Sequence, residues 1–394
     1  MTVSLISLGI WVGLLLVWGQ FWRCNQRLDD RIASPAQTET PLPAICAVIP
    51  ARNEADMLPT TLRSLLAQTY PGPFQLVLVD DHSTDGTADV ARQTAAALGQ
   101  SDRLTVLPAK PLPPGWTGKL WAMEQGTRLA QTLSPAPAYL LLTDADIQHD
   151  SGNLWQLVAK AQQDQLDLVS LMVRLRCQSG WEKLLIPAFV FFFQKLYPFP
   201  LVNRPDSPRA AAAGGCMLIR QTALAKIGGI AAVRQALIDD CALAQAVKGQ
   251  DRSGKIWLGL TQSTRSLRPY DTLDTIWDMV TRTAYTQLNY SPLLLVGTLI
   301  GMALIYLVPP IAAIAGLLTG SWLIALTGFV TWLLMGLAYL PTIRLYQLSP
   351  FWVFSLPAIA VLYTLMTLDS AMRHWRGQGG GWKGRTYDIS AGSK

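Results

Sequence analysis

Apolar and polar residues alternate in blocks between residues 44 and 173. Short runs that are apolar throughout predict buried strands, and the longer segments between them have the mixed pattern of amphipathic helices. Strands of this kind are typical of a mostly parallel sheet covered by helices on both faces. We therefore expect an α/β domain with the architecture of nucleotide-binding proteins. Its elements are expected in this order: strand 44–49, helix 54–69, strand 75–79, helix 85–98, strand 103–107, helix 118–132, strand 138–143, helix 151–163 and strand 167–173.

An uncharged apolar segment, residues 3–22, precedes this domain. We interpret it as a retained transmembrane anchor, residues 1–23, because a signal peptide would have a basic start and a small-residue cleavage site. Arg23, Arg27 and Arg31 follow it directly. By the positive-inside rule they place the next domain in the cytoplasm. A linker, residues 24–43, leads into that domain, and its second part, residues 35–43, is rich in Pro and Thr.

Further apolar segments follow the α/β pattern. After Asn289 the expected spans are 291–317, 321–341 and 350–369, and Pro309-Pro310 would break or kink the first of them. Three more spans would put the basic tail, residues 371–394, outside the membrane, so either one segment is re-entrant or the tail departs from the positive-inside rule. Residues 181–200 are expected to lie in the bilayer interface, with an ordinary buried helix as the alternative.

The composition agrees with a membrane protein. Half of the 394 residues are hydrophobic and 15% are charged, against about 25% in soluble proteins. The net charge of +6 comes from Lys and Arg residues that gather mostly beside the apolar segments, which favours anionic lipid headgroups over nucleic acid as the partner. Five cysteines without a C-x-x-C pair predict neither a disulfide framework nor a zinc site. We therefore expect a multi-pass protein of the plasma (inner) membrane.

Polar residues stand directly after three of the predicted strands. In a parallel sheet these strand ends meet at one edge, where open α/β sheets bind ligands. A short acid-x-acid spacing is weak evidence by itself, but acids clustered at this edge suggest a nucleotide site with a divalent cation. The residues at the strand ends are Pro50, Arg52 and Glu54, then Asp80 and Asp81, then Asp144 and Asp146.

This combination resembles the family 2 glycosyltransferases, whose fold is called GT-A, over about residues 44–290. The resemblance implies that Asp80 and Asp81 contact the base and ribose of a nucleotide sugar, expected to be a UDP-sugar. Glu54, Arg52 and the Pro50 backbone would line the same pocket. It also implies that Asp146, supported by Asp144, holds Mg²⁺ or Mn²⁺ against the donor phosphates. The alternative is that both acids only cap a helix or pair with arginines.

Four further segments complete the resemblance. Gly115 and Gly118 bracket the start of a helix, and Lys119 falls in its first turn. Lys119 would contact the donor diphosphate there, and an exposed lysine on a helix is the alternative. Gly214 and Gly215 would lie under the donor sugar and acceptor, although a tight turn into a strand would look the same.

Two acids, Asp239 and Asp240, stand where family members usually carry Glu-Asp. Asp240 would be the general base, which implies a single displacement that inverts the anomeric carbon. The alternative for Asp239 is a helix N-cap. Arg282, in the segment before the later spans, would contact the diphosphate.

The motif at 115–122 and the tail at 379–385 resemble the branch that contains the hopene-associated and carotenoid-type glycosyltransferases. Residues 281–288 depart from the Gln-x-x-Arg-Trp motif of processive synthases. The sequence therefore predicts an inverting glycosyltransferase that moves a sugar from a nucleotide sugar to a membrane lipid, hopanoid-like, carotenoid-like or other. The alternatives are a glycosyltransferase that makes a polysaccharide or other glycan, a sugar nucleotidyltransferase, and a non-catalytic membrane protein that binds nucleotide.

Overall fold

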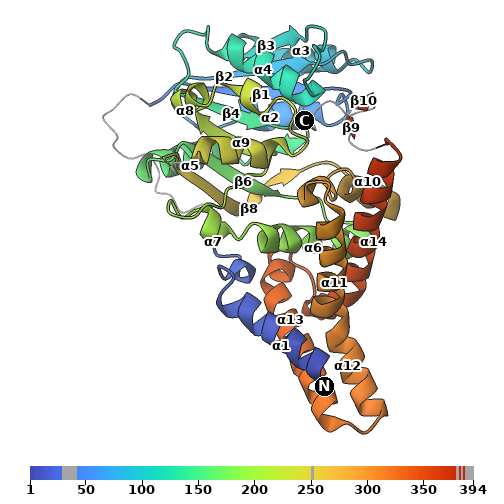
Figure 1. Ribbon diagram of the computed structural model, residues 1–394. Helices are drawn as coiled ribbons and strands as arrows, with labels where there is room; N and C mark the ends of the chain where they lie inside the picture. Colours follow the sequence, from blue (N-terminus) through green and yellow to red (C-terminus); the bar gives the residue numbers. More distant parts are fainter. Residues whose placement is uncertain (29–41, 250–252, 379–380, 383–384, 387–394) are drawn as a thin grey trace. The chain divides into compact units, whose positions relative to one another are not determined.

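Figure 1 shows the computed structural model, which describes residues 1–28, 42–249, 253–378, 381–382 and 385–386. The chain forms two compact units. The helical unit comprises residues 1–25, 176–200 and 269–381, and the α/β unit comprises residues 26–175, 201–268 and 382–394. Most of the predicted linker and of the tail motif lies outside the described residues.

The α/β unit is built on an eight-stranded sheet in the order β3-β2-β1-β4-β7-β6-β8-β5. Neighbours are parallel in the β3-β2-β1-β4 half and between β6 and β8, and antiparallel where β7 meets β4 and β6 and where β5 meets β8. This sheet confirms the predicted mostly parallel α/β fold. The strands are β1 Ile45–Ala51, β2 Phe74–Asp80, β3 Leu104–Pro108, β4 Tyr139–Thr143, β5 Ile147–Gln148, β6 Leu168–Arg174, β7 Cys216–Arg220 and β8 Ile256–Ser266.

Helices cover both faces of this sheet because alternate residues of each buried strand point to opposite sides. Ile45, Ala47 and Ile49 of β1 pack in one core cluster with apolar residues of three helices, α2, α3 and α5. A fourth helix packs on the other face, where a Cβ added to Gly126 would lie 2.5 Å from a Val48 methyl. The helices are α2 Leu58–Leu66, α3 Thr87–Ala97, α4 Gly118–Ala130, α5 Asn153–Gln163, α8 Gln221–Lys226 and α9 Asp239–Lys248.

The register brings the ends of four strands to one edge of the sheet. Ala51, the last residue of β1, pairs with Asp80, the last residue of β2. Because β7 runs antiparallel, its first residue, Cys216, pairs with Thr143 at the end of β4. Strand β5 follows Asp146 directly and pairs with the end of β8. The predicted acids therefore share this edge with the segment before β7 and the segment after β8.

The helical unit holds four helices that are long and apolar enough to cross a membrane: Gly180–Val202, Pro292–Leu318, Trp322–Leu345 and Pro350–Trp375. The last three correspond to the spans expected after Asn289. They expose large apolar side chains, among them Leu293 (80% exposed) and Leu318 (82%), as lipid-facing helices do. The α-helices of this unit are α1 Thr2–Leu16, α6 Gly180–Leu196, α10 Leu273–Thr281, α11 Pro292–Met302, α12 Val308–Leu318, α13 Trp322–Leu345 and α14 Leu356–Trp375. The short helix α7, Phe199–Val202, begins in this unit and ends in the α/β unit.

Pro309 and Pro310 do not end their helix. They lie in the first turn of α12, directly after a π-helical stretch, Ala303–Leu307. Proline lacks an N–H group, so carbonyls one turn earlier lose their usual donors. Side chains of α1 replace them: the Ser7 hydroxyl donates to the Leu304 carbonyl at 2.7 Å and the Trp11 indole to the Ile305 carbonyl at 2.8 Å. The 15-residue α1 helix is shorter than the roughly 20 residues that cross a bilayer, and it packs as a part of the helical unit.

Candidate active site

An arginine that the sequence analysis did not single out connects two of the predicted acids. Arg268 follows β8, and its Nε donates to Asp146 Oδ2 at 2.7 Å. Its Nη2 contacts both carboxylate oxygens of Glu54, at 2.6 and 2.9 Å. Glu54 and Asp146 are 8% and 7% exposed. We call these three residues the Arg268 cluster.

The backbone around the Arg268 cluster is fixed on both sides. The Leu267 N–H donates to the Asp146 carbonyl at 2.8 Å, which continues the pairing of β5 with β8. On the other side, the Glu54 N–H donates to the Thr87 hydroxyl at 2.9 Å. Asn53, next to Glu54, has a positive φ of 52°, a conformation that costs energy for a residue other than glycine. The two loops therefore hold Glu54 at the sheet edge.

The acids after β2 make local contacts. Asp81 is 1% exposed, and its carbonyl accepts a hydrogen bond of 2.6 Å from Arg52 Nη1. His82 Nδ1 lies 3.2 Å from Asp81 Oδ1. Asp80 is half-buried, and one of its carboxylate oxygens accepts from the Ser83 N–H at 3.3 Å. Asp80, Asp81 and Arg52 thus lie beside Pro50 at the end of β1, as the sequence analysis expected.

A second group of charges forms around Lys119. Its ammonium lies 3.0 Å from Asp144 Oδ1 and 3.1 Å from Asp239 Oδ2. Burial alone would lower the pKa of Lys119, but Asp144, Asp239 and Asp240 raise it above its ordinary value. Lys119 is therefore a fixed positive charge. We call these four residues the Lys119 cluster.

Asp240, in the first turn of α9, accepts two backbone hydrogen bonds. The Gly214 N–H donates to Oδ2 at 2.8 Å and the Cys241 N–H to Oδ1 at 2.7 Å. Burial and then the neighbouring Asp239 raise the pKa of Asp240 to about 6, although Lys119 and the two N–H groups act in the opposite direction. A carboxylate with this pKa can accept a proton near neutral pH.

Gly214 and Gly215 lie directly before β7, beside the Lys119 cluster and Val173. A Cβ added to Gly214 would lie 3.4 Å from the Lys119 ammonium and 3.5 Å from Asp240 Oδ2. A Cβ added to Gly215 would lie 3.0 Å from a Val173 methyl. The Gly215 carbonyl accepts from the Thr143 hydroxyl at 2.7 Å, which fastens the segment to the end of β4. A Cβ at Gly214 would therefore be in ordinary contact with two members of the Lys119 cluster, whereas a Cβ at Gly215 would crowd Val173.

His149 supports the same strand end. Its ring is buried, with Nε2 3.0 Å from the Thr143 hydroxyl and Nδ1 3.0 Å from the Asn153 side-chain amide. Burial lowers the pKa of His149 to about 3, so the imidazole is neutral at physiological pH. Both ring nitrogens have partners within the fold, which gives His149 a structural role.

The predicted metal ligands are each next to a cationic side chain. Asp146 pairs with Arg268, and Asp144 pairs with Lys119. Within the part of the chain that the structure describes, no group of three or more His, Cys, Asp or Glu residues could hold a metal ion. Asp146 thus has the arginine partner that was considered as an alternative, whereas the partner of Asp144 is a lysine, and the metal site stays a prediction. Carboxylate oxygens still suit Mg²⁺, which is commonly held by one or two carboxylates together with substrate phosphates.

Arg282 belongs to the helical unit, at the end of α10. Nearby polar groups are used within that unit: the Tyr285 hydroxyl donates to the Tyr290 carbonyl at 2.8 Å. Gln287 accepts from the Tyr197 hydroxyl at 2.7 Å. The contact of Arg282 with a diphosphate stays a prediction.

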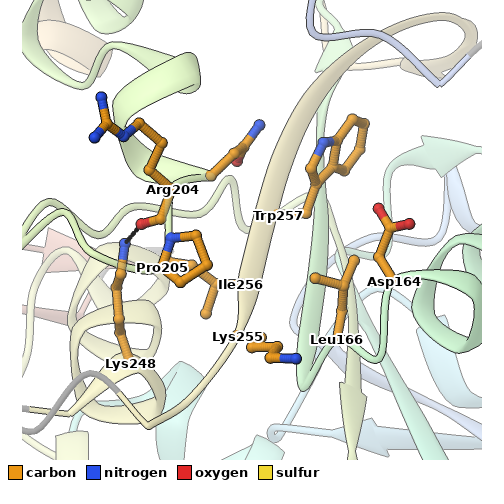
Figure 2. Close-up of a pocket in the computed structure, with 9 residues that line it drawn as sticks. Asp164, Leu166, Arg204, Pro205, Lys248, Lys255, Ile256 and Trp257 are labelled. Carbon is orange, nitrogen blue, oxygen red and sulfur yellow. Dashed lines mark hydrogen bonds between the residues drawn. The ribbon is translucent and has the colours of Figure 1, made fainter.

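A small hollow of about 200 Å³ lies at the opposite edge of the sheet, at the starts of β6 and β8 (Figure 2). Lys248 lines it but is 1% exposed and donates to three backbone carbonyls, those of Val202, Arg204 and Arg209, at 2.8–2.9 Å. Figure 2 shows its bond to Arg204. None of the predicted site residues lines this hollow.

Comparison with known proteins identifies the family of the α/β domain. Residues 46–228 match the model of the family "Glycosyl transferase family 2". The glycosyltransferase AglE of Haloferax volcanii is 37% identical over 67 residues, which are 17% of this chain and 21% of AglE. The PGL/p-HBAD biosynthesis glycosyltransferase of Mycobacterium bovis is 47% identical over 58 residues, which are 15% of this chain and 22% of that protein. The chain thus matches about a fifth of the length of these relatives.

A solved structure extends the likeness of the fold. The mannosyltransferase PcManGT from Pyrobaculum calidifontis, in complex with GDP-Man and Mn²⁺, has a TM-score of 0.53 and 17% identity, and covers 93% of this chain and 98% of its own. These matches confirm the predictions of a GT-A-like fold and of a family 2 glycosyltransferase domain. The resemblance to the hopene and carotenoid branch stays a prediction.

Proposed function

We propose, from the family 2 glycosyltransferase domain that this chain carries, that it transfers a sugar from a nucleotide sugar to a hydrophobic lipid acceptor at the membrane, with inversion. The observation that carries this proposal is Asp240, a carboxylate held by the Gly214 N–H at 2.8 Å. It lies at the sheet edge that also carries the predicted donor residues. A proton acceptor beside a donor site is what a single displacement requires.

Asp240 takes the proton of the acceptor hydroxyl as its oxygen attacks the anomeric carbon. A new carbon–oxygen bond forms on one face of the sugar while the bond to the diphosphate breaks on the other, and the nucleoside diphosphate leaves with the electron pair. Asp239, 3.1 Å from the Lys119 ammonium, helps to hold the charged groups around Asp240. Gly214, which has no side chain, is the proposed neighbour of the reacting sugar.

The donor is bound by residues of the first two strand ends and of α4. Asp80 and Asp81 accept hydrogen bonds from the base and ribose, and UDP is the expected nucleotide. Lys119 contacts the diphosphate from the first turn of α4, a position that favours anions. Asp146, supported by Asp144, is the proposed ligand of Mg²⁺ or Mn²⁺, which supplies Lewis-acid stabilisation of the leaving diphosphate when bound.

The lipid acceptor is supported by the helical unit. Four helices are long and apolar enough to cross a membrane, and their exposed side chains include Trp322 (74% exposed) and Phe351 (81%). An acceptor dissolved in the bilayer is a physical reason to tether the enzyme there. We therefore place the protein in the plasma membrane with its catalytic unit in the cytoplasm, and expect a hopanoid-like, carotenoid-like or other lipid alcohol.

Transfer of labelled sugar into extractable lipid tests the proposal. Membranes that contain the full chain, or its Asp240→Asn variant, are given a panel of UDP- and GDP-sugars with Mg²⁺, with Mn²⁺ or with EDTA. We expect metal-dependent label in the lipid extract that falls about 10²- to 10⁴-fold in Asp240→Asn. Label in water-soluble polymer would favour the polysaccharide alternative, and no label from any donor would favour a nucleotide-binding role.

A further inference from the structure

Arg268 contacts the carboxylates of Glu54 and Asp146 in the protein without a bound nucleotide sugar. Glu54 and Asp146 carry negative charges and are almost fully buried. Burial of like charges without a counter-ion is costly. Arg268 supplies that counter-ion through three hydrogen bonds of 2.6–2.9 Å.

Arg268 also uses an oxygen that a metal ion would need. Its Nε lies 2.7 Å from Asp146 Oδ2. A divalent cation at this oxygen would face a guanidinium that cannot lose its proton. Metal binding at Oδ2 without nucleotide therefore requires the ion pair to break, and binding at the other oxygen of Asp146 would compete with the same guanidinium charge. A diphosphate changes this balance, because its oxygens accept the same fork of donors from arginine as a carboxylate does.

The side chain can exchange partners without movement of the strand. The Leu267 N–H fixes the backbone to the Asp146 carbonyl at 2.8 Å. The Arg268 side chain is 28% exposed, so one side of it faces solvent. A change of the Arg268 side-chain rotamer, with the backbone in place, is the movement that we expect to release Asp146.

We propose that Arg268 is the resident counter-cation of the donor site: it occupies Asp146 and Glu54 in the donor-free protein and releases Asp146 when a metal-bound nucleotide diphosphate enters. This inference rests on the proposed function. Its consequence is thermodynamic coupling, since nucleotide relieves the competition between Arg268 and the metal, and each ligand then strengthens the binding of the other. The donor-free protein would bind metal weakly.

Binding of Mn²⁺ tests this coupling without any transfer reaction. The free Mn²⁺ signal is followed by electron paramagnetic resonance for the full chain in detergent, with and without UDP or GDP, after subtraction of Mn²⁺ bound by nucleotide alone. In the unmodified protein we expect nucleotide to tighten Mn²⁺ binding about tenfold or more. Arg268→Gln is expected to bind Mn²⁺ alone about tenfold tighter, and to lose most of the enhancement by nucleotide.

Two variants control for folding and charge. Arg265→Gln removes an exposed arginine of β8 and is expected to behave like the unmodified protein. Arg268→Lys keeps the charge, so Mn²⁺ alone should bind less tightly than to Arg268→Gln. If Arg268→Gln binds Mn²⁺ alone no tighter than the unmodified protein, the inference is overturned while the proposed function stands. If the unmodified protein binds no Mn²⁺ even with nucleotide, the metal role in the proposed function fails as well.

Discussion

The Arg268 cluster and the Lys119 cluster share one edge of the sheet but balance their charges differently. In the first, one guanidinium contacts two carboxylates, those of Glu54 and Asp146. In the second, one ammonium contacts Asp144 and Asp239 and interacts electrostatically with Asp240 as well. The second cluster therefore carries one more uncompensated negative charge than the first.

This difference separates two chemical tasks. Excess negative charge and burial make protonation of a carboxylate easier, and Asp240 has a pKa raised to about 6. A carboxylate of this kind is suited to proton transfer. The carboxylates of the Arg268 cluster are instead held by a planar fork of donors, an arrangement suited to the exchange of one cation or anion for another. The Lys119 cluster is thus suited to accepting a proton, and the Arg268 cluster is suited to binding a ligand.

Loss of Lys119 is expected to have the largest effect. Lys119→Met keeps the length of the side chain but leaves three neighbouring carboxylates without their cation. We expect the free energy of unfolding at pH 8 to fall by about 3 kcal/mol. The loss should be smaller at pH 5, because protonation of Asp240 removes one of the like charges. Thermal unfolding of the full chain in detergent at the two pH values measures both.

Lys160→Met is the matched control for this variant. Lys160, in the last turn of α5, pairs with Asp164 at 2.7 Å, and their side chains are 24% and 38% exposed. Its ammonium also lies 5.0 Å from the centre of the Trp257 ring. A surface pair of this kind contributes less than about 1 kcal/mol. If Lys119→Met and Lys160→Met lower the free energy of unfolding equally, the cation of the Lys119 cluster contributes no more to stability than that of an ordinary surface pair.

The pH dependence of transfer is the second prediction. Because Asp240 must be ionised to accept a proton, kcat/KM should rise with pH and be half-maximal near pH 6. Lys119 lowers the pKa of Asp240, so Lys119→Met should move the midpoint to higher pH. A rate that is constant between pH 5 and pH 8 would exclude Asp240 as the base.

Stability should depend on pH in the opposite direction to activity. The pKa of Asp240 is about 6 in the folded protein, above its ordinary value of 3.8. Between these values the folded protein binds more protons at Asp240 than the unfolded chain does, so the contribution of this group to stability falls as pH rises. The protein is therefore expected to gain activity while it loses this part of its stability.

The α/β fold could be predicted because its strands are short, apolar and separated by amphipathic helices. Once β1, β2 and β4 are recognised as parallel, Glu54, Asp80 and Asp144 must share one edge. Lys119 and Asp240 are also recognisable from the sequence, Lys119 as a contact of the donor diphosphate and Asp240 as the base, but their proximity to each other is not. Their proximity depends on the antiparallel strand β7, which places Gly214 beside the end of β4.

Arg268 could not be found in the same way. Its partners Glu54 and Asp146 are 214 and 122 residues away in the sequence, and only the pairing of β5 with β8 brings them together. Strand β8 was not predicted, because only its first half is apolar and its second half reads as a polar segment. Tertiary contacts also place the Ser7 and Trp11 side chains, which donate hydrogen bonds to the Leu304 and Ile305 carbonyls before the proline pair.

A methyl group at position 214 is expected to have the smallest effect. It tests whether sugar binding beside the Lys119 cluster can be changed without a change in the basicity of Asp240. Gly214→Ala would add a Cβ 3.4 Å from the Lys119 ammonium and 3.5 Å from Asp240 Oδ2, which are ordinary contact distances. The fold and the pH midpoint should therefore be unchanged. If the donor sugar contacts Gly214, KM for the donor should rise about five- to tenfold, as measured by initial rates of transfer.

Gly152→Ala, whose Cβ would lie 3.6 Å from Asp150 Oδ1, is the control and should leave KM unchanged. An unchanged KM in Gly214→Ala would mean that the sugar approaches Asp240 from another side, and a shifted pH midpoint with unchanged KM would mean that Gly214 acts only through the basicity of Asp240.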